Sequence, residues 1–264
     1  MSTDPPPHQE TEQFWLDFLT KGDPRERQMR RWLAHIPSNP RCRMCAAPFS
    51  GVGAPIMRMM GKGRAAKNPT MCMTCFTFLA AHHGGAEIDV TLLFADIRGS
   101  TAIAEGMTPA AFRAILDRFY DVAAQVVIGN EGEIDKFVGD ELVALFFPML
   151  AGEEHAAHAV EAARALLRTT GHGDPDGPWI SLGAGVHTGV AWVGAVGEGS
   201  HTQITAVGDN VNITARLASA AAAGEILVTT AAATAAHLTD PDAEHRQLAL
   251  KGKSQPTEVV VLRV

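Results

Sequence analysis

Two aspartates stand where a β-sheet would hold them rigidly. Asp96 lies near the end of the apolar run 89–97, which is typical of a buried strand, and Asp140 lies in the tight turn 139–141. Carboxylates fixed at strand ends are frequent components of functional sites. Two of them brought together would form an oxygen-rich site for Mg²⁺, which takes one or two carboxylates plus substrate phosphates. Taken singly, each aspartate is more often a capping or turn residue.

Further polar residues could bind an anionic ligand. The turn after Asp96 contains Gly99, Ser100 and Thr101 and leads toward a helix, so its backbone N–H groups can face a phosphate. Asn212 and Arg216 are four residues apart in a predicted helix and therefore share one face. An amide beside a guanidinium suits a phosphoryl-like group. Seen alone, such a pair is more commonly a solvated polar stripe.

All four cysteines of the chain occur in two Cys-x-x-Cys pairs. Cys42 and Cys45 form the first pair, Cys72 and Cys75 the second, with 26 residues between the pairs. Two such pairs can place four thiolates in a tetrahedron, which predicts one structural Zn²⁺. A metal would also explain how a Gly- and Met-rich stretch with little periodicity folds. A rubredoxin-like iron, an iron–sulfur cluster or a redox pair are the alternatives.

Taken together, these segments resemble the motifs of class III nucleotidyl cyclase catalytic domains. They are FADIRGST (94–101), IDKFVGDE (134–141), TAVGDNVNITARL (205–217) and LKGKSQP (250–256), in the family's order and approximate spacing. The resemblance covers about 89–264, and agreement of several motifs in order is far more specific than any one motif. It implies a ferredoxin-like βαββαβ fold with extra C-terminal strands. The activity it implies is that of an adenylate cyclase, converting ATP to 3′,5′-cyclic AMP and pyrophosphate.

The resemblance also implies how the residues would act. Asp96, Asp140 and the backbone carbonyl of Ile97 would hold two Mg²⁺ or Mn²⁺ ions that bind the triphosphate. One ion would activate the ribose 3′-hydroxyl for attack on the α-phosphate, and the other would steady the leaving pyrophosphate. Asn212 would orient the ribose, and Arg216 would stabilise charge at the α-phosphate.

Phosphate contacts beyond the metals are assigned to two segments. The turn formed by Gly99, Ser100 and Thr101 would face the phosphates. Lys251 would grip the outer phosphates, in preference to the neighbouring Lys253. Lys251 and Lys253 taken alone would be a charged surface turn.

Base choice falls on Lys136 and Thr205. In adenylate-making members, a Lys pairs with the ring nitrogen of adenine, and an Asp or Thr receives its exocyclic amine. Guanylate-making members typically carry Glu and a Cys or similar small residue at these positions. Lys136 and Thr205 therefore favour ATP, and Thr in place of the commoner mammalian Asp resembles many bacterial members. A guanylate or dual-specificity cyclase is one alternative, and a catalytically silent adaptor that binds through its Cys₄ module is the other.

The family builds its site across two chains, which predicts a homodimer with two shared active sites. One chain would supply the metal aspartates, and its partner would supply Lys136, Thr205, Asn212 and Arg216. This chain carries the full set. The polar hairpin around 197–204 is expected at the interface. A regulatory partner is not indicated by any motif.

Hydrophobic periodicity predicts the elements that would position these residues. Helices are expected through Phe14–Leu19 and over 24–35, 108–128, 153–170, 210–222 and 230–237; strands over 89–97, 133–138, 142–147, 180–188, 191–196, up to about Thr205, and over 225–229, 244–250 and 257–263. Several strands are joined by tight hairpins, which favours an α+β sheet over a purely parallel one.

Composition divides the chain into three parts. A helical segment (1–40) with a disordered start and the Cys₄ module (41–88) together carry 11 Lys and Arg against 7 Asp and Glu, whereas the catalytic part (89–264) has a net charge of −11. An acidic body makes nucleic-acid binding unlikely, because that binding relies on clustered Lys and Arg. The absence of an apolar run of membrane-spanning length or of a secretory signal predicts a cytoplasmic protein.

Overall fold

The computed structural model describes residues 8–197, 202–239, 243–250 and 255–264. Within these ranges one mixed sheet has the strand order β2-β3-β1-β4-β6-β8-β7, and β5 pairs with β4 beside this path. The strands are β1 (Gly84–Ile97), β2 (Glu133–Val138), β3 (Glu141–Phe146), β4 (Leu182–Val196), β5 (Gln203–Val207), β6 (Ile226–Thr229), β7 (Glu244–Leu248) and β8 (Thr257–Leu262).

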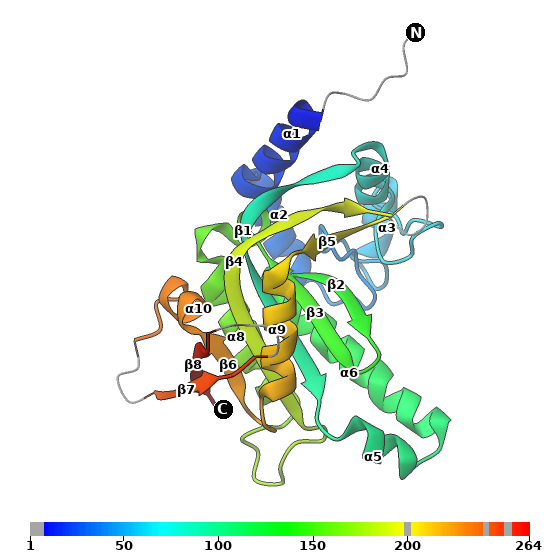
Figure 1. Ribbon diagram of the computed structural model, residues 1–264. Helices are drawn as coiled ribbons and strands as arrows, with labels where there is room; N and C mark the ends of the chain where they lie inside the picture. The colour runs from blue at the N-terminus through cyan, green and yellow to red at the C-terminus, as the bar shows by residue number, and fades with distance from the viewer. Residues whose placement is uncertain (1–7, 198–201, 240–242, 251–254) are drawn as a thin grey trace.

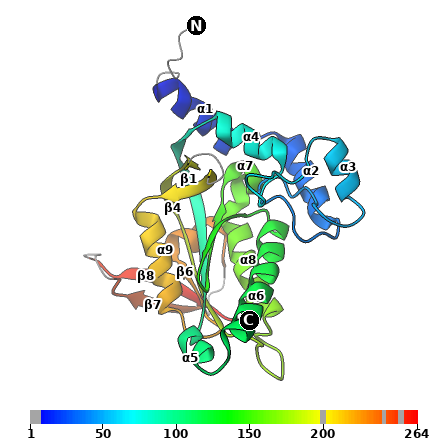
Figure 2. The same ribbon diagram turned by 90° about the vertical axis from the view of Figure 1, so that its right-hand side faces the viewer.

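Helices cover both faces of this sheet. They are α1 (His8–Lys21), α2 (Pro24–His35), α3 (Ala54–Met59), α4 (Met73–Ala81), α5 (Ser100–Glu105), α6 (Pro109–Gly129), α7 (Pro148–Ala151), α8 (His155–Thr169), α9 (Asp209–Ala220) and α10 (Thr230–Ala235). Figure 2 shows α6 and α8 on one face of the sheet and α9 on the opposite face.

The predicted ferredoxin-like βαββαβ order is confirmed. It runs β1-α6-β2-β3-α8-β4, and the four strands lie side by side in antiparallel pairs in the order β2-β3-β1-β4. Successive β1 side chains alternate between faces, so Leu93 and Ala95 pack with Phe119 of α6, while Leu92 and Phe94 belong to the core on the other side. Strands β6 and β8 add the expected C-terminal extension.

One strand prediction was wrong. The stretch expected to form two strands, 180–188 and 191–196, is the single strand β4, paired with β1 from Ile97↔Leu182 to Gly84↔Ala195. Gly189 resembles a turn residue, yet it lies in register opposite Val90. A Cβ there would come within 2.7 Å of the Asn210 amide, so this glycine allows close approach of α9 rather than a reversal of the chain.

Two further boundaries differ from the expected ones. Strand β1 begins at Gly84, five residues before the predicted 89, and its first glycines lie very close to the β4 backbone: a Cβ on Gly85 would meet the Val193 carbonyl at 2.4 Å. The short helix α5 occupies what looked like a simple turn after Gly99.

The N-terminal part packs directly onto the sheet. Trp15, Leu19 and Leu33 are fully or almost fully buried in the same apolar cluster as Val90 and Val193 of the long β1–β4 ladder. In Figure 2, helices α1 to α4 lie together at this end of the sheet. None of the described helices combines the length and apolar character needed to cross a bilayer.

A buried arginine joins the N-terminal part to the sheet. Arg30 of α2 is 5% exposed; its Nε donates to the Met44 carbonyl at 2.9 Å, and its Nη2 donates to the Gly132 carbonyl at 2.6 Å. Burial lowers the pKa of Arg30, while Glu133 and Glu131 oppose that shift. One guanidinium thus satisfies carbonyls from the cysteine segment and from the start of β2.

We expect Arg30→Met to lower the free energy of unfolding by about 2–5 kcal/mol, because it leaves two buried carbonyls and nearby carboxylates unpaired. Denaturant titration followed by circular dichroism measures this change. Arg25→Met, on the exposed side of the same helix, is the control and should shift stability by no more than about 0.5 kcal/mol. Equal effects of the two substitutions would contradict the bridging role.

Candidate functional site

The sheet register brings the predicted metal aspartates together. Asp96 lies opposite Glu141 across the β1–β3 pair, so Asp140, in the β2–β3 turn, falls beside it. Burial, reinforced by the Asp140 carboxylate, raises the pKa of Asp96 to about 6. Burial and the two aspartates likewise raise the pKa of Glu141 to about 7. Clustered carboxylates that resist ionising together are the donor set that a divalent cation would satisfy. Ile97 follows Asp96 as the last residue of β1.

Arg98 is an additional member of this cluster that the motif analysis did not single out. Its guanidinium forms an ion pair with Asp96, and Nη1 donates to the carbonyls of Ser219 (3.2 Å) and Ala221 (3.1 Å). Arg98 therefore ties the Asp96 carboxylate to the C-terminal end of α9. Its position directly after the strand that carries Asp96 is the sequence feature that could have identified Arg98 as part of the site.

The predicted phosphate turn borders the same place. Gly99 has φ +71°, and Ser100 and Thr101 begin α5. Ser100 and Thr101 line a hollow of about 460 Å³ together with Gly139 and Asp140. The structure thus groups the turn with one metal aspartate. Lys251 and Lys253 lie outside the described residues, as do residues 198–201 of the hairpin expected around 197–204.

Lys136 and Thr205, the predicted base-selecting pair, meet within one chain. Strand β5 pairs with the end of β4 and lies near β2 (Figure 1), and this brings Lys136 Nζ to 3.2 Å from Thr205 Oγ1. Asp135 completes the group: Thr205 Oγ1 donates to Asp135 Oδ2 at 2.6 Å, and Lys136 Nζ lies 3.3 Å from the same oxygen. Asp135 is 3% exposed and Thr205 6%. An acidic residue within a largely buried strand was the signal that sequence analysis overlooked.

Asn212 and Arg216 lie one turn apart on α9, as predicted. Asn212 is exposed and Arg216 half-buried. Among the residues that the structure describes, neither side chain has a hydrogen bond or ion pair. Within the described residues, no hydrogen bond or ion pair therefore links the polar pair on α9 to the carboxylate cluster of its own chain.

The four cysteines converge on one point. The Sγ atoms of Cys42, Cys45, Cys72 and Cys75 all lie within 4.8 Å of one another, and none is in a disulfide. The N–H of Cys72 donates to Cys42 Sγ at 3.2 Å, and the N–H of Cys75 donates to Cys72 Sγ at 3.5 Å. Hydrogen bonds from the other thiols, Cys42 first, lower the pKa of Cys72. Backbone donors aimed at clustered sulfurs fit a tetrahedral metal site.

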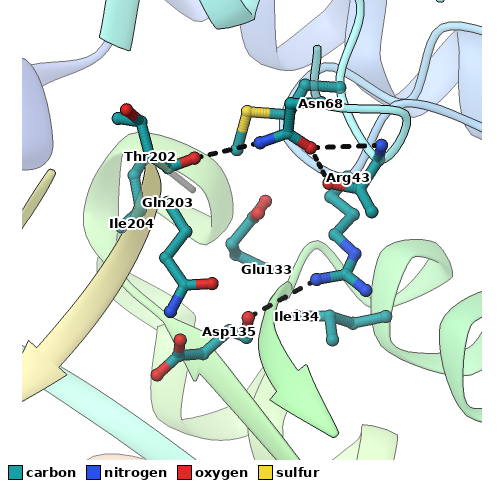
Figure 3. A pocket seen from close by; sticks show the side chains of 10 residues that line it. Arg43, Asn68, Glu133, Ile134, Asp135, Thr202, Gln203 and Ile204 are labelled. Carbon is teal, nitrogen blue, oxygen red and sulfur yellow. Dashed lines mark hydrogen bonds between the residues drawn. The ribbon is translucent and has the colours of Figure 1, made fainter. Parts of the chain in front are cut away.

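The cysteine segment also contacts the base-selecting strands. Arg43, inside the first Cys-x-x-Cys, donates from Nη1 to the Asp135 carbonyl at 3.4 Å, and Asn68 Nδ2 donates to the Thr202 carbonyl, next to β5, at 3.0 Å. Both line a cavity of about 320 Å³, where Figure 3 shows Glu133 between Arg43 and Thr202. Burial raises the pKa of Glu133 to about 7, with Arg30 and Arg43 opposing the rise.

Comparison with known proteins agrees with this geometry. The model of the adenylate and guanylate cyclase catalytic domain matches residues 85–262. "Adenylate cyclase 1" of Rhizobium meliloti is 34% identical over 151 residues, 52% of this chain, and "Adenylate cyclase" of Anabaena cylindrica is 33% identical over 134 residues, 48% of this chain. The aligned parts span only 22% and 26% of those relatives' lengths.

Solved structures of cyclases share the fold. The guanylyl cyclase Cya2 is similar with a TM-score of 0.59 and 28% identity, covering 67% of this chain and 93% of its own. The adenylyl cyclase CyaB from P. aeruginosa is similar with a TM-score of 0.58 and 28% identity, covering 68% of this chain and 96% of its own. Because a guanylyl cyclase and an adenylyl cyclase are equally identical to this chain, overall similarity does not indicate whether its substrate is ATP or GTP.

We expect the purified chain to carry one zinc ion, and Cys42→Ser combined with Cys72→Ser to lose it, because two thiolates cannot hold the ion alone. Elemental mass spectrometry of the purified protein measures this. Met73→Leu, within the second cysteine pair, is the control and should retain the metal. Metal-free wild type, or full metal content in the double variant, would contradict the site; iron in place of zinc would correct its identity.

Proposed function

The chain belongs to the family of adenylate and guanylate cyclase catalytic domains, and we propose that it is an adenylate cyclase that converts ATP to 3′,5′-cyclic AMP and pyrophosphate. The contact between Lys136 and Thr205 carries the choice of base. The ammonium of Lys136 only donates, so it matches the ring N1 of adenine, which accepts. The exocyclic amine of adenine donates where guanine has the accepting O6. A donor beside an acceptor therefore complements adenine.

The carboxylate cluster supports a metal-assisted reaction. Asp96, Asp140 and the Ile97 carbonyl would hold Mg²⁺ or Mn²⁺ against the triphosphate. When bound, these ions supply activation of the attacking hydroxyl and neutralisation of charge on the leaving group. In the reaction, the ribose 3′-oxygen loses its proton and bonds to the α-phosphorus, while the bond from that phosphorus to the bridging oxygen of pyrophosphate breaks.

Residues of α9 would act at the other side of the nucleotide. Asn212 would orient the ribose, and Arg216 would donate to the α-phosphate oxygens as their charge grows. Positioning and fixed charge, without a covalent intermediate, account for this catalysis. Ser100 and Thr101 would contact the phosphates from the hollow they share with Asp140.

The active site would be shared between two copies of the chain. Among the described residues of one chain, no hydrogen bond or ion pair joins Asn212 or Arg216 to Asp96 or Asp140, which is consistent with a site completed by a second copy. A symmetric homodimer supplies both halves twice. The Cys₄ module would regulate the site, since Arg43 and Asn68 contact the backbone of the base-selecting segments.

Product formation from ATP and from GTP, each with Mg²⁺ and with Mn²⁺, tests the function directly. We expect cyclic AMP from ATP and no comparable product from GTP. Arg216→Ala should lower kcat on the order of 10²–10³-fold, as for loss of one transition-state donor. Arg168→Ala, an exposed arginine on α8, is the matched control. Preference for GTP would make the chain a guanylate cyclase, and full turnover by Arg216→Ala would remove that residue's role.

Mixing two inactive variants tests the shared site. Asp96→Ala and Asn212→Ala chains should each be inactive alone. After mixing in equal amounts, half of the dimers are heterodimers with one intact site of two, so about a quarter of wild-type activity should return. Cyclic AMP production after co-refolding or co-expression measures it. No recovery, with dimers confirmed by light scattering, would contradict sites shared between chains.

A further inference from the structure

A threonine hydroxyl does not by itself distinguish adenine from guanine. It can donate its proton to the guanine O6 or accept from the adenine amine. The direction of the Thr205 hydroxyl proton therefore decides what Thr205 recognises. Whatever accepts that proton inside the protein controls the choice.

Asp135 is the acceptor. Its Oδ2 lies 2.6 Å from Thr205 Oγ1 and 3.3 Å from Lys136 Nζ. An ionised carboxylate offers acceptors only, so between these two oxygens the proton must come from Thr205. With its one proton committed, Thr205 Oγ1 retains two acceptor positions. Lys136 takes one at 3.2 Å, and the other remains for a donor from the base.

Asp135 forms an ion pair with the ammonium of Lys136, 3.3 Å from its Oδ2, while opposing influences act on its pKa. Burial raises the pKa of Asp135, whereas the hydrogen bond from Thr205 and the positive charges of Lys136 and Arg43 oppose that rise. Arg43 also donates to the carbonyl of the same residue, so the first cysteine pair holds its backbone in place. The carboxylate is thus held by Lys136 of β2 and Thr205 of β5, and the backbone that bears it is held by the Cys₄ module.

We propose that Asp135 is a positioning residue for base selection: by accepting the Thr205 proton it makes Thr205 an obligatory acceptor, and so makes the site select adenine over guanine. The inference deepens, and rests on, the proposed adenylate cyclase function. It explains how a threonine can accept a hydrogen bond from the adenine amine as an aspartate would. The negative charge lies not on Thr205 but on Asp135 of β2, to which Thr205 donates its proton. Asp135 need not touch the nucleotide.

The test compares the dissociation constants of 3′-deoxy-ATP and 3′-deoxy-GTP, which lack the attacking hydroxyl and report binding without turnover. The full-length wild type should bind the adenine nucleotide more tightly. In Asp135→Asn, the amide can donate to Thr205 and free its proton for the guanine O6. We expect the preference for adenine to fall on the order of 10- to 100-fold. Asp135→Ala removes the contact without adding a donor. It should also weaken the preference for adenine, and it replaces the first variant if that one does not fold.

Two controls separate positioning from a general loss of buried charge. Glu133→Gln neutralises another buried carboxylate of β2, which within the described residues forms no hydrogen bond or ion pair with Thr205 or Lys136. This substitution should leave the preference for adenine unchanged. In a Thr205→Val background, adding Asp135→Asn should change the preference no further, because Asp135 acts through Thr205. An additive further change would contradict this route.

The outcomes distinguish the inference from the proposed function. A wild type that prefers adenine, with an unchanged preference in Asp135→Asn, contradicts the inference and leaves the function standing. A wild type without preference for adenine contradicts the base choice and the inference together. Adenine-selective binding lost in Asp135→Asn, but without cyclic AMP production, supports the inference and counts against the catalytic function alone.

Discussion

The unbroken antiparallel ladder between β1 and β4 is the constraint on which the site depends. It extends from Ile97↔Leu182 to Gly84↔Ala195. One end of β1 presents Asp96 to the β2–β3 turn, while the other end of β4 pairs with β5 and so carries Thr205 toward β2. A one-residue slip would reverse every side chain between the two faces of the sheet. The carboxylate cluster around Asp96 and the hydrogen-bonded group around Thr205 therefore share one register.

The N-terminal part belongs to the same physical unit. Arg30 of α2 donates to the Gly132 carbonyl just before β2, and Arg43, inside the first cysteine pair, donates to the Asp135 carbonyl of β2. Both lie near the buried Glu133. A buried carboxylate is costly unless cations and hydrogen bonds compensate it. The basic N-terminal part supplies those cations to the acidic catalytic part. Metal binding by the cysteines would fix the backbone from which Arg43 extends.

Much of this arrangement could be predicted from the sequence, because its signals are local. Periodicity located α2 over Pro24–His35, and β2, and the motif order predicted the βαββαβ core. What failed was non-local. A glycine at position 189 is compatible both with a turn and with a strand that packs closely against Asn210. Only the packing of α9 against β4 shows which of the two applies. The contacts of Arg43 and Arg98 likewise join segments far apart in sequence, which no periodicity encodes.

Asp135 shows why the sequence can identify Thr205 as a motif residue without showing whether its hydroxyl donates or accepts. Lys136 and Thr205 are identifiable by position, but a hydroxyl has no fixed polarity until its proton has an acceptor. That acceptor is supplied by the residue preceding Lys136 and is aligned only when β5 lies beside β2. In the proposed site, base selection would thus be a property of a three-residue hydrogen-bonded group. Since the Asp135 backbone is also held by Arg43, displacement of the cysteine segment would alter the acceptor as well as the strand that bears it.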